Sequence, residues 1–181
     1  MYFPACKLLS TMAHPVSSRP YRLLFVCLGN ICRSPAAENL MNYTLDQRGL
    51  TGQVVCDSAG TGGYHVGSLP DARMREAAAE SPGIELQGSA RQFSPADFEQ
   101  FDLILAMDRD NYWDILARDP QRHHRDRVKM MCDYCRHHDN VRDVPDPYYG
   151  GPDGFHYVIE LLMDACEGLV DTLIESGAIQ P

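Results

Sequence analysis

The stretch "VCLGNICRSP", residues 26–35, places two cysteines, an arginine and a serine between an apolar run and a segment rich in helix formers. The apolar run predicts a strand over residues 21–26. Cys27 follows at the point where that strand should run out into a turn. A structural cysteine would suit the interior of the strand, so this position indicates a thiol that another molecule can reach.

The same ten residues mark the start of a helix. Ser34 is the predicted N-cap, because a serine hydroxyl can accept from a free backbone N–H of the first turn. Pro35 then takes the first helical position, where its missing N–H is no loss. The helix is predicted to cover residues 36–48 and to end at Gly49.

Strands and helices alternate along the rest of the chain. Periodicity and capping residues predict further strands over residues 54–58, 102–107 and 127–132, and further helices over 71–80, from Ser94 for a few residues, over 110–118 and over 154–176. The last helix carries an apolar stripe of Tyr157, Leu161, Leu162, Ala165, Leu169 and Leu173. This alternation predicts an α/β fold with a mostly parallel sheet and helices on both faces. Ligands of such sheets bind beyond the carboxyl ends of the strands.

Composition narrows the class of protein. A length of 181 residues suits one domain. The net charge of -9 argues against a nucleic-acid surface, which needs a basic stripe, and no apolar run approaches the ~18 residues of a membrane span. Seven irregularly spaced cysteines favour a reducing compartment over disulfide staples. We expect a cytoplasmic monomer or weak homodimer without nucleic-acid or membrane partners.

Residues 1–20 differ from the rest of the chain. They contain no acidic residue and three prolines, and they show no helical or strand periodicity. An organellar transit peptide, a disordered extension and a true start at Met12 all fit this composition. We predict an irregular N-terminal extension over residues 1–20 and a single domain over residues 21–181.

The loop after the first strand is suited to hold an anion beside a thiolate. Gly29 and Asn30 tolerate positive φ, so successive backbone N–H groups can turn inward as an anion-binding nest. The following helix start adds free N–H groups, and Arg33 adds a planar fork for two phosphate oxygens. The same groups stabilise the thiolate of Cys27, and Ser34 can donate to its sulfur. Such a loop predicts attack of sulfur on phosphorus.

Two motifs carry a resemblance to a known family. "CLGNICRSP" directly after the first strand and "DPYYGG" at residues 146–151 resemble the low-molecular-weight protein tyrosine phosphatase family, as do "DSAGTGGYHVG", "ARQF" and "LAMDRDN". The resemblance covers residues 21–176. It implies a single doubly wound domain with a four-stranded parallel sheet, and hydrolysis of phosphotyrosine in protein substrates and of small aryl phosphates without a metal or other cofactor.

The resemblance also implies a role for each site residue. Cys27 attacks the phosphate monoester and forms a phosphocysteine, while Arg33 and the loop amides hold the phosphate oxygens. Asp146 protonates the leaving phenolate and then activates water to release phosphate. The residues implied to bind phosphate or support the loop are Leu28, Gly29, Asn30, Ile31, Cys32, Ser34 and Ser58. Those implied to form the slot for the aromatic ring are Leu28, Tyr64 and Tyr148.

Two loop residues bear on specificity and regulation. Family members that act on phosphoarginine carry threonine where this chain has Ile31, which favours tyrosine as the substrate residue. The family uses a cysteine pair like Cys27 and Cys32 to form a disulfide that protects the nucleophile from over-oxidation. We therefore predict that Cys32 is a redox partner of Cys27.

Alternatives remain open for the whole chain and for one cluster. A thioredoxin-coupled arsenate reductase shares the fold and loop but needs further cysteines in the middle of the chain, which are missing between Cys56 and Cys132. A catalytically silent phosphotyrosine-binding module is the non-enzymatic alternative. Cys132 and Cys135 have the spacing of half a zinc site, of a redox pair or of an ordinary strand end followed by a polar loop.

Overall fold

Five helices, four strands and two 3₁₀ turns make up the part of the chain that the computed structural model describes, residues 19–138 and 140–181. In chain order they are β1 (Tyr21–Cys27), α1 (Arg33–Gln47), β2 (Val54–Gly60), α2 (Ala72–Glu80), α3 (Asp97–Gln100), β3 (Leu103–Ala106), α4 (Arg109–Leu116), η1 (Arg125–Arg127), β4 (Val128–Met130), η2 (Met131–Tyr134) and α5 (Pro152–Glu175). The predicted extension over residues 1–20 lies outside this description except for Arg19 and Pro20. The Arg19 guanidinium pairs with Asp102 at 2.6 Å.

The four strands form one parallel sheet in the order β2-β1-β3-β4. This confirms the predicted α/β fold with a doubly wound, four-stranded sheet. The chain moves outward from β1 to β2 and then crosses back to β3, so the strand order reverses between β1 and β3. Cys27 ends β1 opposite Gly60 of β2, at the carboxyl edge beside this reversal. Ligands of open parallel sheets bind at such a point.

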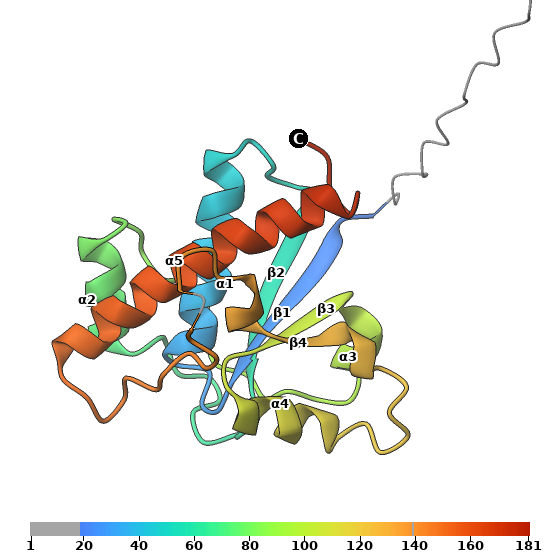
Figure 1. Cartoon of the computed structure of the whole chain (residues 1–181). Helices are drawn as coiled ribbons and strands as arrows, with labels where there is room; N and C mark the ends of the chain where they lie inside the picture. Colours follow the sequence, from blue (N-terminus) through green and yellow to red (C-terminus); the bar gives the residue numbers. More distant parts are fainter. Residues whose placement is uncertain (1–18, 139) are drawn as a thin grey trace, which may run out of the picture.

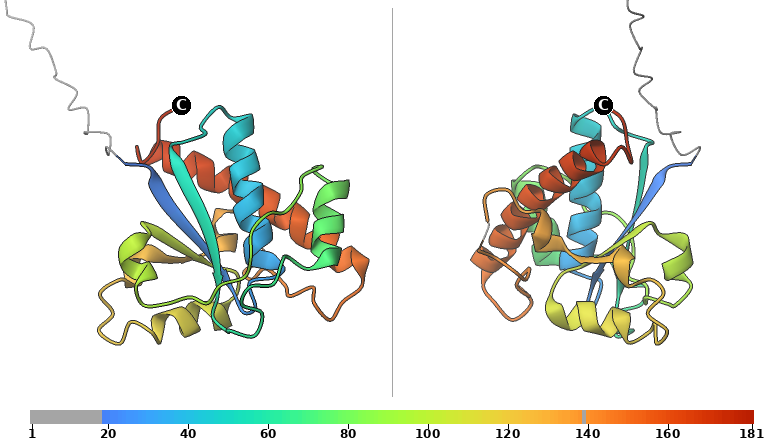
Figure 2. Two further views of the ribbon diagram at one scale, coloured as in Figure 1. Left: turned by 180° about the vertical axis from the view of Figure 1, so that it is seen from behind. Right: turned by 45° about the vertical axis from the view of Figure 1, so that its right-hand side comes forward.

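The two central strands are buried on both faces, which explains their unbroken apolar sequences. Successive side chains of a strand point to opposite faces of the sheet. Leu23 and Phe25 therefore join one core cluster, formed largely with α1 and α5. Leu24 and Val26 join a second cluster on the other face, which includes Phe98 of α3. Figure 2 shows helices on both sides of the sheet.

The long C-terminal helix α5 crosses α1 and extends to α2 on one face of the sheet, whereas α4 covers β3 and β4 (Figure 1). The predicted stripe on α5 is buried at Leu161, Leu162, Ala165, Leu169 and Leu173. Tyr157 is the exception, because its side chain is 38 % exposed and its ring lies 6.3 Å from that of His138. Among the described residues, no helix combines the length and apolarity that crossing a membrane requires.

One difference from the predicted elements lies around β4. A strand was predicted over residues 127–132, but β4 ends at Met130 and the chain turns into η2. This turn brings the backbone carbonyl of Tyr134 against Gly168 of α5, where a Cβ atom would clash with it. Residues 131 and 132, predicted as the end of the strand, therefore belong to η2, which packs against α5.

Candidate active site

The loop between β1 and α1 folds back over the sulfur of Cys27. Asn30 has a φ of 55°, in the left-handed region that asparagine tolerates better than most residues. This conformation lets the backbone N–H of Asn30 donate to the Cys27 sulfur at 3.3 Å. The thiol is only 2 % exposed, so it lies on the floor of a pocket and not on the outer surface.

The side chain of Asn30 holds the loop in this shape. Its Nδ2 group donates to the hydroxyls of Ser34 at 2.9 Å and Ser58 at 2.8 Å, and its Oδ1 accepts from the backbone N–H of Arg91 at 2.8 Å. These contacts join the loop to β2 and to the segment before α3. Asn30, Ser34 and Ser58 are all polar and buried, and each has hydrogen-bond partners, as burial requires.

Ser34 is not the N-cap that the sequence predicted. The helix begins at Arg33, with Cys32 in the cap position and no side-chain cap hydrogen bond. The Ser34 hydroxyl lies inside the first turn, 3.0 Å from the Cys27 sulfur and 3.3 Å from the carbonyl oxygen of Ala59. The sequence signal for a cap was correct in placing a helix start here, but the hydroxyl contacts the thiol instead of the helix backbone.

Arg33 projects from the start of α1 toward two carboxylates. Its Nη1 donates to Asp108 at 2.5 Å and to the carbonyl oxygen of Val144 at 3.2 Å, and its Nη2 donates to Asp146 at 2.9 Å. Burial alone would lower the pKa of Arg33. The negative charges of Cys27, Asp146 and Asp108 outweigh this effect and raise the pKa above its ordinary value, so the group remains a cation. A buried guanidinium without partners would be costly, and these acceptors offset that cost.

Sequence reasoning missed Asp108. It lies two residues after the end of β3 and caps α4, where its Oδ1 accepts from the backbone N–H of Asn111 at 2.7 Å while its Oδ2 faces Arg33. A signal was present in "LAMDRDN", in which an aspartate stands between a buried strand and a helix. That pattern indicates a cap, however, and says nothing about an arginine 75 residues earlier in the chain.

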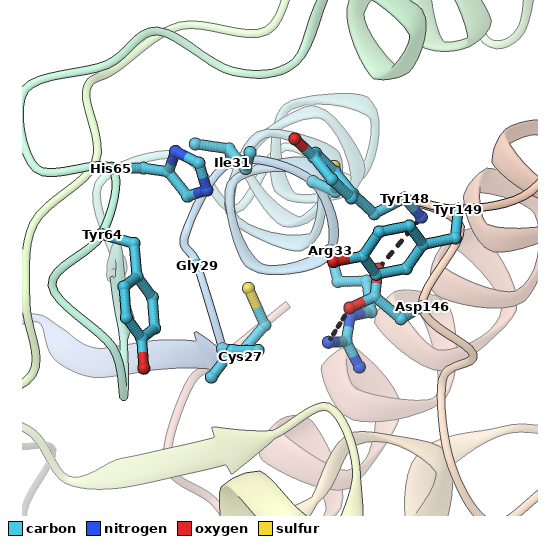
Figure 3. A pocket seen from close by; sticks show the side chains of 11 residues that line it. Cys27, Gly29, Ile31, Arg33, Tyr64, His65, Asp146, Tyr148 and Tyr149 are labelled. Atoms are coloured by element: carbon cyan, nitrogen blue, oxygen red, sulfur yellow. Dashed lines mark hydrogen bonds and ion pairs between the residues drawn. The ribbon is translucent and has the colours of Figure 1, made fainter.

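Asp146 lies on the loop before α5 and lines the same pocket as Cys27. Its Oδ2 accepts from Arg33, and its Oδ1 accepts from the backbone N–H of Tyr148 at 3.1 Å. The side chain is 41 % exposed, so water reaches the carboxylate. Figure 3 shows Asp146 facing the cavity across from Tyr64 and His65, with the Cys27 sulfur between the two sides.

The pocket above the thiol has a volume of about 320 Å³. Its walls come from the loop, from residues after β2 and from the loop before α5, and they are Cys27, Leu28, Gly29, Ile31, Cys32, Arg33, Tyr64, His65, Asp146, Tyr148 and Tyr149. Asn30, Ser34 and Ser58 support the loop from behind. His65 and Tyr149 lie within the motifs at residues 57–67 and 146–151, but they were not predicted to line the pocket.

Aromatic side chains flank the entrance to the pocket. Tyr64 is 79 % exposed on one side, and the ring of Tyr148 lies on the other side, 6.5 Å from that of His65. The Arg73 guanidinium lies 5.2 Å from the Tyr148 ring and donates to the Tyr148 carbonyl oxygen at 3.0 Å. The rings therefore border a slot that ends at the sulfur of Cys27.

At Cys32 and Cys132 the surroundings favour the protonated thiol. Cys32 lines the pocket beside Cys27, and burial, with help from the Asp71 charge, raises its pKa to about 12. Cys132 lies in η2, where a hydrogen bond with Cys135 and burial raise its pKa far above the usual range. Within residues 19–138 and 140–181, no group of three or more metal-ligating side chains lies close enough together to hold a metal ion.

Comparisons with known proteins identify the relatives of the chain. A family model described as low molecular weight phosphotyrosine protein phosphatase matches residues 22–178. A protein of Synechocystis, described as a candidate low molecular weight protein-tyrosine-phosphatase, is 60 % identical over 152 residues, which cover 84 % of this chain and 96 % of that protein. The human low molecular weight phosphotyrosine protein phosphatase is 33 % identical over 150 residues, covering 82 % and 93 % of the two chains.

Solved structures show the same likeness. A protein tyrosine phosphatase from Entamoeba histolytica with Hepes in its active site gives a TM-score of 0.82 at 46 % identity, covering 87 % of this chain and 99 % of that chain. The crystal structure of YfkJ from Bacillus subtilis gives a TM-score of 0.78 at 37 % identity, covering 88 % and 98 %.

Proposed function

The chain belongs to the low molecular weight phosphotyrosine protein phosphatase family, and from this we propose that it hydrolyses phosphotyrosine with Cys27 as nucleophile, Arg33 as phosphate ligand and Asp146 as general acid and base. One observation supports this assignment above the others. A sulfur, a guanidinium and a carboxylate from a strand end, a helix start and a distant loop line one pocket. We assign the catalytic domain to residues 21–181.

The first chemical step is attack of the Cys27 sulfur on phosphorus. The backbone N–H of Asn30, the Ser34 hydroxyl and the start of α1 lie around the sulfur, where they can stabilise the negative charge of an attacking thiolate. The sulfur–phosphorus bond forms as the phosphorus–oxygen bond of the ester breaks, which leaves a phosphocysteine and a phenolate. We assign the binding of the phosphate oxygens to the loop amides from Leu28 to Cys32.

Arg33 makes one hydrogen bond, to Asp146, that a bound phosphate would replace. Its Nη1 is held by Asp108 and the Val144 carbonyl oxygen, which are not substrate groups. Its Nη2 contacts Asp146, and a phosphate dianion offers a stronger charge at that position. On substrate binding, Nη2 turns from Asp146 to phosphate, while Asp108 keeps the guanidinium in place.

Asp146 then acts on the leaving group. Once released from Arg33, its carboxyl group can carry the proton that the phenolate oxygen needs. The ionised carboxylate next takes a proton from water, which attacks the phosphocysteine and frees inorganic phosphate and the Cys27 thiolate. The exposed position of Asp146 at the mouth of the pocket gives water access for this second step.

The walls of the pocket support an aromatic substrate. Leu28, Tyr64 and Tyr148 border the slot and offer apolar and aromatic surface to the ring of phosphotyrosine or of a small aryl phosphate. Ile31 adds apolar surface to the pocket lining, which suits a phenyl ester better than a charged guanidinium. Tyrosine-phosphorylated proteins are therefore the proposed substrates.

Redox regulation is part of the proposal. Peroxide oxidises the Cys27 thiolate to a sulfenic acid, and the sulfur of Cys32 displaces water from it to form a disulfide. A thiol then reduces the disulfide and restores the enzyme. Both sulfurs line the same pocket, which supports this pairing. We further propose that the protein is a cytoplasmic monomer or weak homodimer. Sedimentation equilibrium would measure its mass in solution.

Hydrolysis by four proteins tests the assignment: wild type, Cys27→Ser, Asp146→Ala and the control Asp153→Ala, whose carboxylate is exposed at the start of α5. We expect no turnover by Cys27→Ser and chelator-insensitive turnover by the others. Asp146→Ala should lose about 10²-fold or more in kcat on a phosphotyrosine peptide. It should lose much less on p-nitrophenyl phosphate, whose leaving group needs no proton.

Three outcomes would contradict the proposal. Full turnover by Cys27→Ser would exclude the phosphocysteine. Equal losses from Asp146→Ala on the two substrates would show that this residue does not protonate the leaving group. Phosphate binding without turnover by the wild type would make the protein a binding module instead.

A further inference from the structure

Glu38 is a half-buried carboxyl group for which the proposed chemistry has no use. It lies on α1, more than one turn after Arg33, and faces β2. The hydroxyl of Ser58 donates to its Oε2 at 2.7 Å. Ser58 is one of the residues that support the loop around Cys27, so the contact connects Glu38 to the active site.

Four hydrogen bonds link this carboxyl group to the nucleophilic sulfur. The Ser58 hydroxyl, bonded to Glu38, accepts from Asn30 Nδ2, and the same Nδ2 donates to the Ser34 hydroxyl. Ser34 in turn lies 3.0 Å from the sulfur of Cys27. The chain therefore runs from α1 through β2 and the loop back to the first turn of α1.

Counting donors and acceptors gives the chain a direction. The backbone N–H of Arg91 donates to Asn30 Oδ1, so the other end of the amide is the NH₂ group, whose two hydrogens go to Ser58 and Ser34. Each serine accepts from Asn30 and has one hydrogen left to donate. Ser58 gives its hydrogen to Glu38. Ser34 can give its hydrogen to the Cys27 sulfur or to the carbonyl oxygen of Ala59.

We propose that Glu38 is a positioning residue for Cys27, because it is the terminal acceptor that holds the Ser58 hydroxyl in place for Asn30 and so keeps the Ser34 hydroxyl donating to the sulfur. The inference rests on Cys27 being the nucleophile, as proposed above. Without an acceptor at position 38, the Ser58 hydroxyl rotates to donate to another group, and its oxygen moves away from Asn30. The amide then loosens, and the Ser34 hydrogen divides between the sulfur and Ala59.

The surroundings of Glu38 decide when it can play this role. Burial raises its pKa to about 7; the Ser58 hydrogen bond and the Arg91 charge oppose this rise, and the Asp57 charge adds to it. Cys56 on β2 also interacts with Glu38, and its thiol stays protonated because burial raises its pKa. An ionised carboxylate can only accept, whereas the protonated acid can also donate to Ser58. Glu38 therefore holds the Ser58 hydroxyl most strongly above pH 7, where it is ionised.

The test compares Glu38→Ala, Glu38→Gln, Ser58→Ala and the double variant with Asp46→Ala, which removes an exposed acid from the same helix. Two quantities are measured against pH: the rate of Cys27 alkylation by iodoacetamide, located by mass spectrometry, and kcat/KM on a phosphotyrosine peptide. Thermal unfolding shows that each variant is folded.

Glu38→Ala should lower kcat/KM by about three- to tenfold, the effect of a weakened hydrogen bond to a charged group. It should also move the midpoint of Cys27 alkylation to higher pH, and the loss should be greater at pH 8 than at pH 6. Glu38→Gln should stay within about twofold of wild type, because its amide oxygen still accepts from Ser58. Adding Ser58→Ala to Glu38→Ala should cost little more, since both break one chain.

The inference is wrong if Glu38→Ala keeps the wild-type alkylation profile. It is equally wrong if Glu38→Gln is as impaired as Glu38→Ala, since charge would then matter and the acceptor would not. Alkylation reports on the thiolate without any turnover. The result for Glu38 is therefore separate from the failure of the proposed function, which the Cys27→Ser assay would reveal.

Discussion

Replacing Glu38 by glutamine should change how the stability of the protein depends on pH. Burial raises the pKa of Glu38 from an ordinary 4.5 to about 7 in the folded protein. Between these values the folded protein holds a proton that the unfolded chain has released. Stability therefore falls as pH rises from 4.5 to 7, and the full cost is present above pH 7. Glutamine cannot ionise, so its folded form escapes this cost.

The size of the effect follows from the two pKa values. At ~1.4 kcal/mol for each tenfold difference in proton affinity, the change from 4.5 to about 7 corresponds to about 3 kcal/mol. Glu38 is only half-buried, and solvent screening reduces this to about 2 kcal/mol. Relative to wild type, Glu38→Gln should thus gain about 2 kcal/mol of unfolding free energy between pH 4.5 and pH 8.

Urea unfolding at several pH values between 4.5 and 8 measures this difference. The constant part of the difference reports the change from acid to amide, and only the part that varies with pH reports the titration. Asp46→Asn, on the exposed side of the same helix, provides the control and should show no comparable rise. A Glu38→Gln difference that stays flat over the whole range would refute the reasoning, because Glu38 would then titrate alike in both states.

Three further predictions follow from single contacts. Asp108→Asn removes the carboxylate that holds Arg33 and should raise KM for a phosphotyrosine peptide about tenfold, whereas Asp110→Asn should not; equal KM values would contradict the role of Asp108. Gly168→Ala forces a Cβ atom against the Tyr134 carbonyl oxygen and should cost more than ~2 kcal/mol in urea unfolding, while Gly154→Ala, whose Cβ has room, should cost little. Cys32→Ser should make peroxide inactivation irreversible by thiol, and full recovery of this variant would exclude the Cys27–Cys32 disulfide.

The order of elements was predictable because short-range patterns carried it. Unbroken apolar runs indicated the two central strands, and the stripe on α5 indicated its buried face, with Tyr157 as the one error. Element ends were less predictable. The structure starts α1 at Arg33 and stops β4 at Met130, because the Ser34 hydroxyl is used by the thiol and η2 packs against Gly168.

The active-site loop could be identified from its own residues, since the anion nest, the helix start and the thiol all lie within ten positions. Its distant partners were harder to find. Asp146 came from a resemblance, and Asp108, His65 and Glu38 were missed because nothing near them in the chain indicates the contacts they make. Glu38 looks like an ordinary helix residue until Ser58 of β2 is placed beside it.

The sequence by itself determined the alternation of strands and helices and the anion-binding loop around Cys27. Both depend on interactions within a few residues: side-chain periodicity, positive φ at Asn30 and free N–H groups at a helix start. Only the tertiary structure decided which carboxylates hold Arg33 and which acceptor ends the hydrogen-bond chain from Cys27. Those choices depend on distances between residues from different elements, and such distances exist only after the sheet and its helices have packed.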